Sequence, residues 1–192
     1  MGCNELATNA DKLNSSSSQT SSGQVAVDID MESLNKNLDD LEVSIAEVEN
    51  QMSKVNVSFL SGQVPSGSQK GVVSELKTVL DRLVTVATLA FSKVDELRAQ
   101  IDVQLAKLDP ANPLHQAALL KLNEALTYLD ALEVQLRDRF KLLVSQIGKV
   151  VKSIDDRIAA MDPKNPLTIG LSILWGQVRA IILDFEARLL AI

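Results

Sequence analysis

Apolar side chains recur through residues 28–59 at steps that alternate between three and four positions. Three- and four-residue steps place side chains on one face of an α-helix, and their alternation is the heptad repeat of a coiled coil. We therefore predict a heptad coiled-coil helix over residues 28–59. The stripe that we expect to form its seam with a partner helix comprises Leu34, Leu38, Leu41, Ile45, Val48, Met52 and Val55.

The same rhythm returns after residue 71 and predicts three more helices. They run from Val73 to Leu108, from Pro113 to Met161, and from Leu167 to the last residues of the chain. In the middle one, the stripe slips by one position between Leu136 and Phe140, so we expect a bend or a change of neighbours there. The predicted fold class is all-α: a three- to four-helix elongated bundle of long antiparallel amphipathic helices with coiled-coil packing.

Two polar stretches divide the chain. Residues 1–27 are rich in Ser and Asn, a composition that buries too little apolar surface to offset chain entropy, so we predict a disordered tether. Residues 60–71 contain Pro65 among glycines and serines, which predicts a linker. The expected organisation is a tether, a heptad helix at 28–59, this linker, and a three-helix antiparallel arrangement at 72–192.

Two similar corners separate the last three helices. Leu108-Asp109-Pro110-Ala111-Asn112-Pro113-Leu114 matches Met161-Asp162-Pro163-Lys164-Asn165-Pro166-Leu167, and identical residues continue outside the corners, as with Glu133 and Glu186. This similarity suggests an internal repeat. A residue before proline leaves the α region, so the aspartates should end their helices. The asparagines should act as N-caps, each followed by a proline at the first helical position. The residues expected to form the corners are Asp109, Asn112, Pro113, Asp162, Asn165 and Pro166.

Composition narrows the classes of function. Aromatic residues make up 3% of the chain and the net charge is −6, so both the basic surface and the stacking side chains of a nucleic-acid-binding protein are missing. A core of this chain must be built from aliphatic side chains, which suit helix–helix seams. The longest uncharged apolar run, between Lys164 and Arg179, is too short for a typical membrane-spanning helix of about 20 residues.

The sequence contains no recognisable catalytic constellation. His115 is the only histidine and begins a helix, Cys3 is the only cysteine, and the glycines are scattered instead of forming a phosphate-binding loop. The carboxylates fall between the apolar positions and are typical of a solvated helix face. We expect no enzyme activity, no cofactor, no metal and no small-molecule substrate.

The first three residues, Met1-Gly2-Cys3, resemble the start of dually acylated proteins, which would carry myristate on Gly2 and palmitate on Cys3. Leu6 stands where that pattern has Ser or Thr. The same start followed by a Ser/Asn-rich stretch is also similar to mature bacterial lipoproteins, which would imply a lipid on Cys3. An inert cysteine is the third alternative. The location is therefore open between the periphery of a membrane and the cytoplasm.

Two function hypotheses follow. The first is a non-enzymatic structural or interaction protein that associates with itself or another helical protein through coiled-coil packing, with membrane tethering through Cys3 as an option. Its heptad helix could equally fold back and complete an intramolecular bundle. The second is a membrane- or lipid-active bundle that opens to expose apolar faces, with Leu171, Leu174 and Trp175 as the membrane face.

Overall fold

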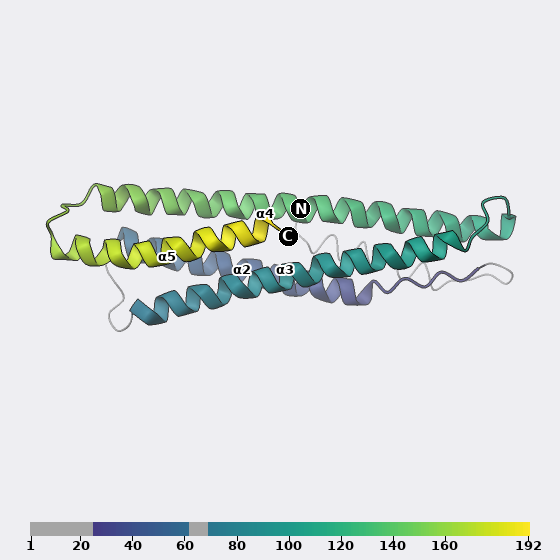
Figure 1. The fold of residues 1–192 in the computed structure, drawn as a ribbon, viewed down its shortest axis with the longest axis horizontal. Helices are drawn as coiled ribbons and strands as arrows, with labels where there is room; N and C mark the ends of the chain where they lie inside the picture. Colours follow the sequence, from purple (N-terminus) through teal and green to yellow (C-terminus); the bar gives the residue numbers. More distant parts are fainter. Residues whose placement is uncertain (1–24, 62–68) are drawn as a thin grey trace. The chain divides into compact units, whose positions relative to one another are not determined.

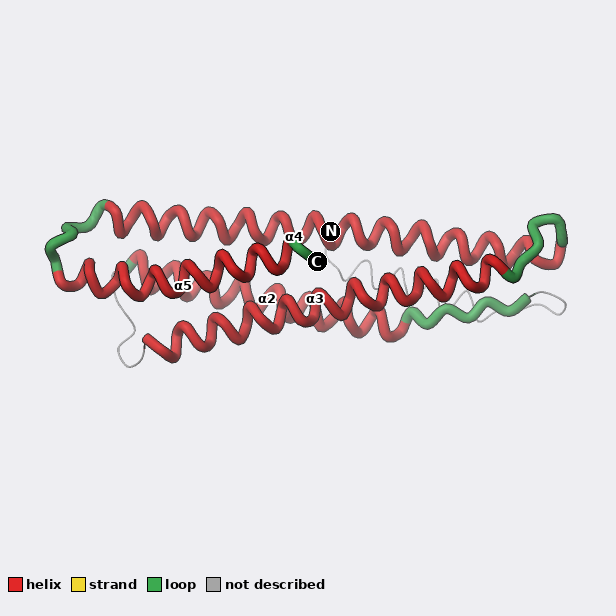
Figure 2. Tube along the Cα trace, in the orientation of Figure 1, coloured by secondary structure: helices red, strands yellow, loops and turns green. Residues whose placement is uncertain are grey.

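The computed structural model describes residues 25–61 and 69–192 (Figures 1 and 2). This part of the chain contains four α-helices: α2 (Glu32–Leu60), α3 (Gln69–Ala106), α4 (Gln116–Ala159) and α5 (Pro166–Leu190). A short 3-10 helix, Pro113–His115, precedes α4, and the described residues form no strand. The predicted all-α fold of packed long helices is confirmed. The predicted tether, up to residue 24, and the centre of the predicted linker lie outside the described residues.

The chain divides into two compact units, and α2, α3 and α4 each contribute to both. Unit 1 combines residues up to Glu42 with Thr88–Arg137, and unit 2 combines Val43–Ala87 with Asp138–Ile192. This division differs from the one expected at the linker, since α2 is not set apart from the helices that follow it.

Unit 1 packs an extended segment against portions of three helices. In residues 25–31, Val27, Ile29 and Met31 are buried while the residues between them are exposed. This alternation has the period of an extended chain, in which successive side chains point to opposite sides. The Gln104 side chain donates a hydrogen bond to the Asp28 carbonyl, at 3.1 Å, and holds the segment against α3. The helix predicted from residue 28 therefore begins four residues later, at Glu32.

Unit 2 packs portions of α2, α3 and α4 against the whole of α5. Its core is mostly aliphatic and contains four aromatic rings, those of Phe59, Phe140, Trp175 and Phe185. The rings of Phe59 and Trp175 meet edge to face, 5.2 Å between centroids. Such pairs stabilise a core beyond the area they bury. The largest side chain of α5 thus points inwards.

The slip predicted in α4 coincides with the boundary between the two units. The buried positions step by four twice in succession, from Leu132 to Leu136 and to Phe140, and unit 1 ends at Arg137. Two steps of four rotate the buried stripe around the helix, so α4 presents a different face to its neighbours in unit 2.

Candidate functional site

The stripe expected to bind a partner along α2 is buried within the chain. All seven of its residues are at most 4% exposed, and Leu34, Leu38 and Leu41 are fully covered inside unit 1. The structure therefore corresponds to the fold-back alternative for this helix. A partner helix could reach the stripe only if α2 left its present neighbours.

The residues expected to face a membrane are also core residues. Leu171, Leu174 and Trp175 are 1–4% exposed. The Trp175 indole Nε1–H donates to the Asp155 carboxylate at 2.6 Å, which satisfies the polar tip of the ring. These residues could therefore reach a membrane only if the bundle opened, as the second hypothesis requires. The two residues expected to be acylated, Gly2 and Cys3, lie outside the described residues.

The two corners have the same hydrogen bonds. The backbone N–H of Leu114 donates to Asn112 Oδ1, and that of Leu167 to Asn165 Oδ1, each at 3.0 Å. Both asparagines are N-caps with extended backbone, followed by Pro113 and Pro166. Asp109 and Asp162 each accept from the backbone N–H two residues further on. Their polar atoms thus serve the turns themselves, which is the local chemistry of helix ends.

His115 belongs to the first corner. Its Nδ1 accepts a hydrogen bond, 2.9 Å long, from the backbone N–H of Asp109. Its Nε2 lies 3.4 Å from the amide nitrogen of Asn112. These contacts place the only histidine in the turn between α3 and α4, where it holds the backbone in position.

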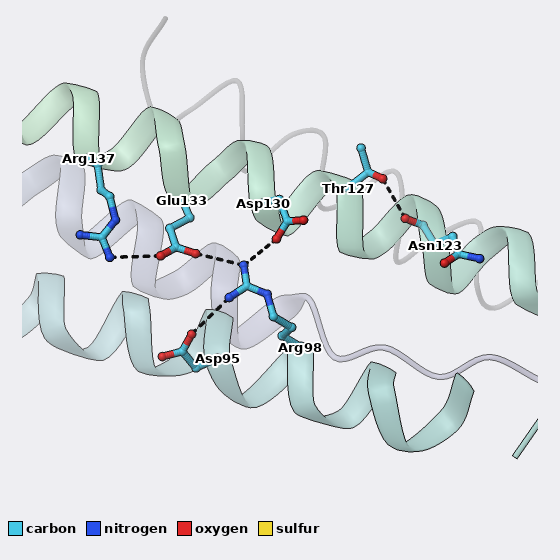
Figure 3. Close-up of polar contacts among 7 residues, drawn as sticks. All are labelled: Asp95, Arg98, Asn123, Thr127, Asp130, Glu133 and Arg137. Atoms are coloured by element: carbon cyan, nitrogen blue, oxygen red, sulfur yellow. Dashed lines mark hydrogen bonds and ion pairs between the residues drawn. The ribbon is translucent and has the colours of Figure 1, made fainter. Parts of the chain in front are cut away.

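Unit 1 contains a charged cluster that joins α3 to α4 (Figure 3). Arg98 of α3 reaches across to Asp130 at 2.8 Å and Glu133 at 3.0 Å on α4, and also contacts Asp95 on its own helix. Arg137 binds the second oxygen of Glu133, at 3.1 Å. Hydrogen bonds from Arg98 and then Arg137 hold the pKa of the Glu133 carboxyl below its usual value.

The ion pairs of unit 2 have the same character. Arg82 binds Glu47 at 2.9 Å, Arg139 binds Glu49 at 2.7 Å, and Arg188 binds Asp81. Each pair joins two helices, as does the contact from Arg179 to Asp155, at 3.2 Å. The described residues contain no group of three or more His, Cys, Asp or Glu placed to hold a metal ion. The charges of these ion pairs join neighbouring helices within unit 2.

The outward face of α5 differs from the rest of the described surface because it is apolar along its length. Five of the fifteen exposed large hydrophobic side chains lie on this one helix. We call its outward heptad series the α5 outer stripe; it consists of Ile169, Ile173, Gly176, Ala180, Leu183, Ala187 and Leu190. All seven are exposed, with the four large side chains 43–59% accessible.

By length and composition α5 would also be able to cross a membrane, with a mean hydropathy of 1.5 over its best 18-residue window. One third of that window is buried in the structure, and a core helix of a globular domain passes the same test. The uncharged run in the sequence ends at Arg179, whereas α5 continues to Leu190.

Sequence reasoning missed the α5 outer stripe although its spacing is visible in the chain. Two apolar series run along this helix, and only the one that contains Leu171 and Leu174 was predicted as a stripe. Gly176, Ala180 and Ala187 contribute little hydrophobicity, so the second series is weak until the structure shows which series is exposed.

Comparison with protein-family models, with curated proteins and with solved structures finds no match to this chain.

Proposed function

We propose that this protein is a non-enzymatic helical interaction protein that associates with itself or with another helical protein. In this proposal α5, not α2, provides the contact. An acylated Cys3 would tether the chain to a membrane, with the Ser/Asn-rich residues as the spacer.

The observation that carries the proposal is the α5 outer stripe. Ile169, Ile173, Leu183 and Leu190 stay about half exposed while the opposite face of the same helix is buried. Exposed apolar side chains that line up along one helix are typical of an association surface, whereas scattered single ones are ordinary. The other described helices carry two or three such residues each, fewer than α5, and in α3 the polar residues Ser92 and Glu96 lie between Leu89 and Val103.

The polar groups support the same proposal. The helix-to-helix ion pairs of both units, and the hydrogen bonds of the two corners, stabilise the arrangement of the helices. A scaffold with these features presents a rigid surface, and rigid surfaces lose little conformational entropy on binding.

A photocrosslinking amino acid at position 173 of the full chain, produced in its native host, tests the proposal. The expected result is a discrete protein adduct, either with a second copy or with another protein. Position 120 on α4 provides the control because Leu120 is equally exposed, 62% against 59% for Ile173. Equal labelling at both positions, or no adduct at either, would contradict an association surface on α5.

The hydropathy of α5 favours a second candidate, a lipid-active bundle that opens at a membrane. The charged residues of α5 disfavour this candidate. The negative charges of Asp184 and Glu186 balance the positive charges of Arg179 and Arg188, whereas helices that bind membrane interfaces are rich in cations. Flotation of the Cys3→Ser protein with phosphatidylcholine–phosphatidylglycerol vesicles tests it. Binding without an acylated cysteine would support membrane activity, and binding that requires the acylated Cys3 would support only a tether.

A further inference from the structure

We infer that the α5 outer stripe is the seam of a homodimer, in which it packs against the same stripe of a second copy of this chain. The inference rests on the proposed association function and names its partner. It concerns only α5, which lies wholly within unit 2.

The spacing of the stripe fits a two-helix seam. From Ile169 to Leu190 its members alternate steps of four and three, over 21 residues or three heptads. A heptad pattern of this length, about 32 Å of helix, is enough to indicate pairing with another helix. The stripe is one residue wide on each turn, and Ser172, Gln177, Arg179 and Asp184 on its flanks are polar and exposed. A narrow stripe with polar edges matches a helix seam better than the broad apolar face that lies in a bilayer.

Packing within the chain does not require a glycine at position 176, and the same is true of Gly148 and Gly170. A Cβ added there would meet no atom within 4 Å. Glycine inside a helix costs roughly 0.5–1 kcal/mol relative to alanine. With Ala180 one turn away, it leaves a shallow section in the middle of the stripe, where the backbone of a second helix could approach closely. Large side chains at Ile173 and Leu183 flank this section on either side.

The start of α4 follows the same kind of corner as α5, and its exposed face is mostly polar. Five of the seven matching positions, 53 residues earlier, are polar: Gln116, Asn123, Thr127, Asp130 and Arg137. The other two, Leu120 and Val134, are apolar and exposed. Two of the polar residues, Asp130 and Arg137, belong to the Arg98 cluster. The corner that begins both helices is the same, so the apolar character belongs to the outer face of α5 and not to the corner motif.

The charges beside the stripe are self-complementary. If two copies of α5 run antiparallel with Ala180 against Leu183 of the second copy, Arg179 faces Glu186 of that copy. If they run parallel, Arg179 faces Asp184 of the second copy. Asp184 lies five residues further along the sequence, the spacing at which flanking residues of parallel coiled coils pair. A twofold axis produces each pair twice. In both arrangements Arg179, which also contacts Asp155 of its own chain at 3.2 Å, meets a carboxylate of the second copy, so the flanks favour a second copy.

Other occupants fit less well. Residues 1–24 contain only Leu6 and Leu13 as large aliphatic side chains besides Met1, too few to cover seven stripe positions. A lipid surface would gain little from flanks in which acidic residues balance the basic ones. Both are nevertheless separate outcomes of the experiment below.

The experiment is sedimentation equilibrium of the full chain carrying Cys3→Ser, which removes disulfide-linked dimers. Concentrations on the order of 10–500 µM cover the range expected for a small interface. We expect a monomer–dimer equilibrium, and a dissociation constant raised at least about tenfold by Ile173→Glu or by Leu183→Glu, since a charge then lies in the centre of the seam. Leu120→Glu on α4 is the matched control and should dimerise like the parent protein. Circular dichroism and Trp175 fluorescence establish that each variant is folded.

The outcomes separate the inference from the proposed function. A monomer at every concentration would overturn the homodimer, while an adduct of position 173 with another protein would still support the proposed association. A dimer that neither α5 variant weakens would overturn the α5 seam and leave self-association standing. If a monomeric Cys3→Ser chain floats with the vesicles, and Ile173→Glu abolishes that binding, the occupant is lipid and the homodimer is wrong.

Discussion

Glu133 and Glu186 occupy matching positions, 53 residues apart, yet their surroundings act on them in opposite directions. Glu133 accepts hydrogen bonds from Arg98 and Arg137, which lower its pKa below the ordinary value of 4.5. Burial against the core of unit 2 raises the pKa of Glu186, and Arg179 offsets only part of that effect. Replacing each by glutamine keeps the shape of the side chain and removes the charge. The two variants should therefore change stability with opposite signs.

The magnitude for Glu133→Gln follows from its two ion pairs, at 3.0 and 3.1 Å, with the Glu133 side chain 25% exposed. Partly exposed pairs contribute roughly 0.2–1 kcal/mol each, so the loss at pH 7 should be about 1 kcal/mol. For a chain of this size, that corresponds to a Tm lower by about 2–4 °C. Glu186→Gln should raise the free energy of unfolding at pH 7, because the variant buries no charge.

The pH dependence provides the sharper test. A lowered pKa makes the contribution of Glu133 complete above 4.5, and this contribution is lost as the pH falls through the folded-state pKa. The deficit of Glu133→Gln should therefore shrink on acidification below 4.5. A raised pKa works in reverse: below 4.5 Glu186 is protonated whether folded or unfolded, so the gain of Glu186→Gln should appear only as the pH rises above 4.5.

The assay is urea denaturation followed by circular dichroism between pH 3 and 7. Glu124→Gln on exposed α4 surface is the control and should change stability little. The reasoning fails if both variants shift stability in the same direction at pH 7. It also fails if the deficit of Glu133→Gln persists unchanged at pH 3.

Three further outcomes can be measured on single variants. Asn112→Ala and Asn165→Ala should each cost about 1 kcal/mol in thermal unfolding, since each removes one N-cap bond; unequal losses would mean that the similar corners are not equivalent. Trp175→Phe should lose roughly 1–3 kcal/mol because it removes the hydrogen bond to the Asp155 carboxylate, which keeps its contact with Arg179; an unchanged midpoint in urea contradicts this. Leu41→Asp should abolish the cooperative unfolding transition in circular dichroism, because the side chain is fully buried; a folded variant would place α2 outside the core.

The periodicity of apolar residues was sufficient to predict the helices, their length and their inward faces. The heptad series of α2 is buried at every position, and the helix predicted from Val73 to Leu108 is observed as α3, Gln69–Ala106. Periodicity could not tell which helix covers which stripe, because a seam between two chains and a seam within one chain have the same spacing. That ambiguity led to α2 as the expected contact. The extended residues 25–31 were missed because their alternation is only seven residues long and runs directly into a heptad helix.

The exposed face of α5 was missed for a different reason. A helix that is apolar on two faces has no single direction of hydrophobicity, so a stripe containing Leu171, Leu174 and Trp175 obscured the one beside it. The structure separates them by burying one and exposing the other. Likewise, no pattern in the sequence indicates that Arg98 reaches Asp130 and Glu133, since such a contact depends on how two antiparallel helices are rotated.

Helix α5 has one apolar face buried in unit 2 and a second apolar face exposed, and the exposed face indicates association. Packing within the chain uses the inward face of α5 completely, and polar residues at Ile169, Ile173, Leu183 and Leu190 would change folding stability by only about ±0.5 kcal/mol if these positions were ordinary surface. The matching segment of α4 has polar residues at most of these places and folds onto the same kind of corner. A contiguous apolar surface exposes a protein to aggregation, so its presence on one helix alone calls for an occupant. The flanking charges of α5 complement one another in either direction of pairing, and the occupant that they favour is another copy of α5.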